Sequence, residues 1–240
     1  MCGWGVCDDQ RRLDQKKRLR FSGFCFFLFV LFFIFLSLFE SPAFSFSRGE
    51  KSQDFLLPEK RLSLSLKFVE FVNEQGVPIV DQLSLKSMIH VLNQIYAPCD
   101  LSFLLGEYEV VQPGGVGLPP APRSLQEMRA FRKPFMDHRH LVVIHTASWD
   151  HQSVGPANAW TAMPGDSPLG AVIEGKVGRF VGIIAHELGH YLNLSHVQDD
   201  SNVMNPMIYR KSNQITESQC KAVRHAASVY HSPALRRVSL

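Results

Sequence analysis

The chain has 240 residues, of which 45% are hydrophobic and 20% are charged. This composition is that of an ordinary globular protein, and the length allows one principal domain once any targeting segment is removed. The formal net charge is +3. Much of that charge lies in the first 43 residues, so the nearly neutral remainder gives no electrostatic reason to expect a nucleic-acid partner.

The N-terminal segment, residues 1–43, has the pattern of a signal peptide. Residues 21–39, FSGFCFFLFVLFFIFLSLF, contain no charge and directly follow the basic run RRLDQKKRLR. Because Lys and Arg stay on the cytoplasmic side of a membrane, this order places the rest of the chain outside the cytoplasm. Small residues at Ser41 and Ala43 favour cleavage after Ala43, which would give a secreted or periplasmic protein. The alternative is an uncleaved membrane anchor, since residues 21–39 as a helix would span about 28 Å, close to the hydrocarbon core of roughly 30 Å.

The remaining chain is expected to comprise a linker or short pro-segment at residues 44–60 and one folded domain at residues 61–240. Runs that alternate apolar and polar residues predict half-buried strands, and apolar residues at helical spacing predict amphipathic helices. The predicted elements are a strand at 61–72, a helix at 83–96, a strand at 101–111, a short helix at 124–132, strands at 141–148, 157–163 and 170–175, a helix at 179–192, and a last helix that begins with a capping box at Thr216. This order predicts an α/β (α+β) fold with one principal sheet.

Two cysteines, Cys99 and Cys220, lie in the predicted domain, and the other three lie in the N-terminal segment. In an exported domain these two could form one disulfide, or they could remain buried free thiols. The sequence leaves both alternatives open, because it does not show whether the two side chains meet.

A cluster of metal-ligand residues lies in the stretch VGIIAHELGHYLNLSHVQDDSNVMNPMIY. His186 and His190 are four residues apart on the predicted helix, a separation of about 6 Å in rise and about 40° in rotation, so both imidazoles leave the same face. Glu187 is close enough to reach a water on the metal. His196 is too far round to share that face, so the helix has to end near Asn193, a residue type that adopts the left-handed conformation of helix ends. This spacing predicts a Zn²⁺ site with three histidine ligands.

These residues resemble the signature of the metzincin zinc peptidases, H-E-x-x-H-x-x-G-x-x-H followed by a Met-turn. HELGHYLNLSH matches each position except the glycine, which is Asn193 here, and Met204 in NVMNP resembles the Met-turn of matrixins. Upstream, ANAWTAMPG and GAVIEG resemble the edge strand and the following strand of matrixins and pappalysin-like enzymes. The resemblance implies a metzincin-like zincin domain with one mixed twisted sheet, an active-site helix, a Met-turn and a C-terminal helix.

The function that this resemblance implies is that of a zinc-dependent endopeptidase acting on peptide bonds of extended polypeptides. Three protein ligands leave a fourth position on the zinc for a water, on which Glu187 would act as the general base. Met204 would form a hydrophobic floor beneath the ligands, and Tyr209 a pocket wall or core residue rather than a neighbour of the zinc. The edge segment that would bind the polypeptide by strand addition comprises Ala157, Asn158, Ala159, Trp160 and Thr161.

Two other functions are compatible with these motifs. The first is a zinc-binding module, exported or tethered to a membrane, without peptidase activity. The presence of Glu187 argues against it, because metal binding does not need that carboxylate. The second is a metallohydrolase that acts on cell-wall peptides.

Four further histidines cluster in sequence around a predicted strand: His138, His140, His145 and His151. Matrixins carry a second, structural zinc on a His-rich loop. The aspartate that such a site needs is not spaced here as in that family, so ordinary surface or core histidines are the favoured interpretation.

Overall fold

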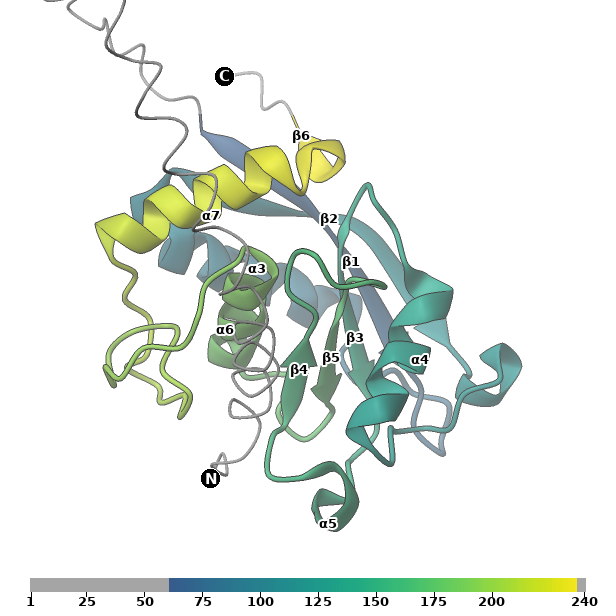
Figure 1. Ribbon diagram of the computed structural model, residues 1–240. Coiled ribbons are helices and arrows are strands. Elements are labelled where there is room, and N and C mark those ends of the chain that lie inside the picture. The colour runs from purple at the N-terminus through teal and green to yellow at the C-terminus, as the bar shows by residue number, and fades with distance from the viewer. Residues whose placement is uncertain (1–60, 237–240) are drawn as a thin grey trace, which may run out of the picture. The chain divides into compact units, whose positions relative to one another are not determined.

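Figure 1 shows the computed structural model, in which residues 61–236 are described. The signal peptide or anchor and the linker or pro-segment, which are predicted within residues 1–60, lie outside the described residues. Within residues 61–236, no helix combines the length and the apolar character needed to cross a membrane.

A mixed sheet of six strands forms the centre of the domain (Figure 1). Its strands, in order across the sheet, are β2 (Leu101–Val111), β1 (Leu62–Phe71), β3 (Leu141–Thr146), β5 (Ala171–Glu174) and β4 (Ala159–Thr161), with β6 (Leu235–Arg236) paired to the start of β1. The first four are parallel to one another, whereas β4 runs antiparallel to β5. β4 is therefore an edge strand of opposite direction.

The helices cover the two faces of the sheet unequally (Figure 1). One face packs against α3 (Gln82–Tyr96), α6 (Val181–Tyr191) and α7 (Glu217–Val229), and the other against α4 (Met128–Arg132). The alternation along β1 explains this arrangement: Leu64, Leu66 and Phe68 join the larger core, whereas Val69 and Phe71 join the smaller one.

The predicted α/β class and the order of elements are confirmed, with differences in the short pieces. The helix predicted at 124–132 is a 3₁₀ turn at Leu125–Glu127 followed by α4, and the strand predicted at 157–163 is reduced to the three residues of β4. A short helix, α5 (His151–Val154), and strand β6 were not predicted. Elements this short contain too few residues for a periodic pattern to be recognised. The remaining 3₁₀ turns are Ala97–Cys99, Pro113–Val116, Lys133–Phe135 and Ser232–Ala234.

A disulfide joins α7 to the rest of the domain, and a capping box forms the start of the helix. Cys99 and Cys220 form a disulfide, which decides between the two alternatives that the sequence left open. At the start of α7, the Thr216 hydroxyl accepts from the Gln219 backbone N–H and the Gln219 side chain accepts from the Thr216 N–H, which confirms the predicted capping box.

Candidate active site

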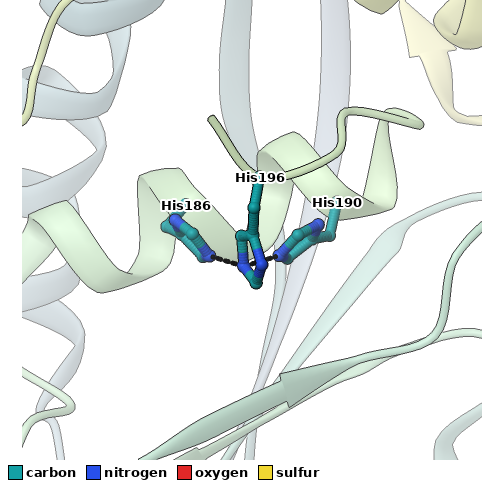
Figure 2. Close-up of side chains that lie close together, drawn as sticks. All are labelled: His186, His190 and His196. Atoms are coloured by element: carbon teal, nitrogen blue, oxygen red, sulfur yellow. Dashed lines mark hydrogen bonds between the residues drawn. The ribbon is translucent and has the colours of Figure 1, made fainter. Parts of the chain in front are cut away.

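Three imidazoles converge beside α6, as Figure 2 shows. His186 and His190 project from successive turns of the helix, and His196 reaches back from the segment after it. The Nε2 atom of His196 lies 3.1 Å from that of His186 and 3.0 Å from that of His190, and the ligand atoms of all three lie within 4.8 Å of one another. Two nitrogen ligands of a tetrahedral zinc lie about 3.3 Å apart, so this spacing fits a single ion.

Asn193 provides the break that lets His196 return to the helix face. Its φ is +67°, the left-handed conformation expected from the sequence, and the Leu194 N–H donates to the Gly189 carbonyl at 2.9 Å. The same turn presents the Leu194 carbonyl to His190 Nδ1 at 2.8 Å. One turn therefore ends α6, orients the His190 imidazole and redirects the chain toward His196.

Backbone carbonyls fix the orientation of two imidazoles. His186 Nδ1 donates to the Val203 carbonyl and His190 Nδ1 to the Leu194 carbonyl, both at 2.8 Å. Because a carbonyl only accepts, Nδ1 carries the proton and the Nε2 lone pair is directed at the metal position. Burial lowers the pKa of His186 to about 3 and that of His190 to about 4, so both imidazoles are in the neutral, metal-binding form at neutral pH.

Glu187 lies beside the triad and is buried, with 5% of its surface exposed. The Thr161 hydroxyl of β4 donates to its Oε2 atom at 2.5 Å. Burial raises the pKa of Glu187 to about 7, while the hydrogen bond from Thr161 acts in the opposite direction. The carboxylate is therefore held between α6 and the edge strand.

Met204 packs directly beneath α6 and is fully buried. A Cβ atom added at Gly189 would lie only 2.3 Å from Met204 Sδ, so a side chain at position 189 would collide with Met204. The turn is fixed by Asn202, whose Oδ1 accepts from the Met204 N–H and whose side-chain amide exchanges two hydrogen bonds with that of Gln219. α7 thus supports the floor of the histidine site.

The predicted edge segment contributes unequally to the surface next to the triad. Asn158 turns its side-chain amide inward to Glu174 at 2.6 Å, and Trp160 packs against the smaller core on the opposite face of the sheet, with Arg132 5.2 Å from its ring centroid. Thr161 and Ala159 face α6. Tyr209 is 39% exposed and contacts Met207 and Lys211.

The four other histidines do not converge. His145 is buried and bonds Glu70 at 2.6 Å, whereas His151 bonds the buried Glu174 at 3.1 Å. His140 bonds Asp137 and, with Glu107, forms a second group of metal-ligand atoms among residues 61–236. One carboxylate of that group, Glu107, is already paired with the Lys67 ammonium at 2.8 Å.

Several supporting residues were missed by sequence reasoning. Glu70, Glu174 and Asn202 carry no local motif that reveals their buried partners, and the predicted capping box that includes Gln219 does not reveal its pairing with Asn202. Gly189 did carry a signal, because a glycine inside a helical pattern costs about 1 kcal/mol relative to alanine and can have a packing reason, which here is Met204.

The comparisons with known proteins agree with this site. Residues 147–230 match the family model of matrixin. The structure resembles mature mirolysin of Tannerella forsythia in complex with a cleaved peptide, with 13% sequence identity, coverage of 75% of this chain and 100% of that chain, and a TM-score of 0.55. It also resembles a mutant of Tannerella forsythia promirolysin, with 12% identity, coverage of 74% of this chain and 84% of that chain, and a TM-score of 0.55. Metalloproteinase-II from Bacteroides fragilis is also similar, with 12% identity, coverage of 70% of this chain and 55% of that chain, and a TM-score of 0.47. This chain therefore spans about half of the length of that protein. Among curated proteins, none matches the chain.

The fold, the histidine triad and the Met-turn resemble those of metallopeptidases of the metzincin type, as the motifs predict. Within that class, residues 147–230 resemble the matrixins.

Proposed function

We propose that this protein is a zinc-dependent endopeptidase that hydrolyses peptide bonds of extended polypeptides. The observation that carries the proposal is the convergence of three imidazoles beside a buried glutamate and an edge strand. His186, His190 and His196 would hold the ion, and their two carbonyl-bonded Nδ1 atoms leave the opposite nitrogens free to bind it. When bound by three imidazoles, zinc supplies Lewis-acid polarisation of a carbonyl and acidifies water.

Glu187 would serve as the proton carrier in this site. Its carboxylate would accept a proton from the attacking water and deliver it to the leaving amine, the role of a general base and then a general acid. Its burial would limit competition from bulk water, and its hydrogen bond to Thr161 would keep it on the side of α6 that faces a polypeptide bound along β4.

The substrate would bind along β4. Within the described residues, β4 pairs with β5 on one side only, so its other edge can accept an extended polypeptide as a further strand. Backbone atoms of Ala157–Thr161 would make that pairing. Tyr209, which is exposed beyond the Met-turn, would form part of a pocket wall.

The proposed place of action is outside the cytoplasm. The Cys99–Cys220 disulfide supports this location, because disulfides persist in oxidising compartments. The basic run and apolar segment of the N-terminus predict the same location, either as a secreted form or as a form anchored through residues 21–39.

Casein cleavage by the purified full chain tests the proposal, with zinc quantified in the same sample. The matched variant is Glu187→Gln, which keeps the three ligands. We expect the wild type to carry about one zinc and to cleave, and the variant to keep zinc but lose cleavage by at least about 100-fold. Zinc binding without cleavage of casein by either protein would contradict the proposal, and parallel assays on cell-wall peptides would then separate the alternative hydrolase from a binding module.

A further inference from the structure

Thr161 joins the proposed substrate strand to the proposed catalytic base. It is the last residue of β4, where its backbone pairs with Ala171 of β5. Its neighbour Trp160 faces the opposite core, so the alternation of the strand turns the Thr161 side chain toward α6. There its hydroxyl donates to Glu187 Oε2.

This hydrogen bond is the only one to the Glu187 side chain among residues 61–236. A buried carboxylate is costly without a donor, and a hydrogen bond to a charged group is among the stronger ones in proteins. Because one oxygen of Glu187 accepts from Thr161, the torsion of the carboxylate is set and Oε1 is left for proton transfer.

We propose that Thr161 is a positioning residue, whose hydroxyl aligns the Glu187 carboxylate with a polypeptide paired to β4. The proposal rests on the proposed peptidase function. The side chain suits this role, because a β-branched threonine is stiff at χ1 and fits a strand, so its hydroxyl is directed with little freedom. The residue that would pair with the substrate through its backbone would therefore also orient the base through its side chain.

Thr161→Val and Thr161→Ser form a matched pair for the test. Valine keeps the shape and removes the hydroxyl, whereas serine keeps the hydroxyl and removes a methyl group. The zinc-loaded full chain and both variants would be assayed on fluorescein-labelled casein. We expect Thr161→Val to lower kcat by about 10- to 100-fold with KM changed by less than about 3-fold, and Thr161→Ser to recover most of the loss. Zinc content should be the same in all three proteins.

A second measurement does not depend on activity. In the metal-free full chain, Thr161→Val should lower the thermal midpoint by about 3–10 °C when Glu187 is present, and by less than half as much in a Glu187→Ala background.

An unchanged kcat in Thr161→Val, with active wild type, would overturn the positioning role and leave the peptidase function intact. If the wild type did not cleave at all, the peptidase function and the positioning role that rests on it would both fail, and the double-mutant cycle would then report on the hydrogen bond alone. Equal shifts of the midpoint in the two backgrounds would show that the hydroxyl and the carboxylate are not coupled, and would also overturn the inference.

Discussion

Gly189 lies within α6 directly above Met204, and it leaves no room for a side chain. An added Cβ would lie 2.3 Å from Met204 Sδ, whereas ordinary contacts begin near 3.4 Å, so the sulfur would have to move by about 1 Å. Overpacking of this kind costs about 1–3 kcal/mol, and alanine is better than glycine within a helix by about 0.8–1 kcal/mol. We therefore expect Gly189→Ala to lower the free energy of unfolding by about 0–2 kcal/mol.

The larger effect of Gly189→Ala is expected on zinc. Val203, the residue before Met204, accepts the hydrogen bond from His186 Nδ1. A displaced Met204 disturbs this carbonyl, and loss of such outer support typically weakens metal binding by about 10–100-fold. We expect the affinity for zinc to fall by about 10-fold or more.

Gly182→Ala is the matched control on the same helix. Its added Cβ would meet the ends of the Phe180 and Ile208 side chains at 3.1–3.2 Å, contacts that need only small adjustments. Both variants would be compared by urea unfolding of the metal-free protein and by competition for zinc with a chromophoric chelator. Zinc binding in Gly189→Ala as tight as in Gly182→Ala, with equal stability, would refute the placement of Met204 against α6.

Three further predictions concern pH, the helix end and the disulfide. Without zinc, the free energy of unfolding should fall as the pH drops from about 6.5 toward 4, because His186 and His190, with pKa values of about 3 and about 4, stay neutral in the folded chain while the unfolded chain takes up their protons. Glu187, with its pKa raised to about 7, binds one proton in the folded state over this pH range, which offsets one of the two protons that the histidines of the unfolded chain take up. Glu187→Gln should therefore make the fall of the free energy of unfolding with decreasing pH steeper in urea titrations. A free energy of unfolding that stays constant or rises as the pH drops, in both proteins, would contradict the lowered histidine pKa values. Asn193→Gly should leave thermal stability unchanged or raise it, and Asn193→Ala should lower the free energy of unfolding by about 1 kcal/mol, because the residue has a φ of +67°. Replacing both Cys99 and Cys220 by alanine should lower the free energy of unfolding by about 2–5 kcal/mol in urea, since the disulfide closes a loop with a sequence separation of 121.

Local patterns predicted most of the fold and the centre of the site. Alternation along 61–72 and helical spacing along 83–96 are set by which face of an element is buried, so they are readable from neighbouring residues. The spacing of His186 and His190, and the need for a turn near Asn193, follow from helix geometry in the same way. These features appear in the structure at the expected positions.

Contacts between distant elements could not be predicted from such patterns. Thr161 was expected to bind substrate, but its hydrogen bond to Glu187 depends on how β4 lies against α6. The pairing of Asn202 with Gln219 likewise depends on the docking of α7 below the Met-turn. Each of these contacts is set by tertiary packing rather than by any local sequence signal.

X-ray absorption at the zinc edge, on the zinc-loaded full chain, tests the central claim most directly. The triad predicts about one zinc per chain with three imidazole nitrogens at roughly 2.0–2.1 Å and one further light-atom ligand, and His196→Ala should remove one imidazole from that set. A chain that binds no zinc, or a zinc with sulfur in its coordination shell, would contradict the assignment of His186, His190 and His196 as the metal ligands.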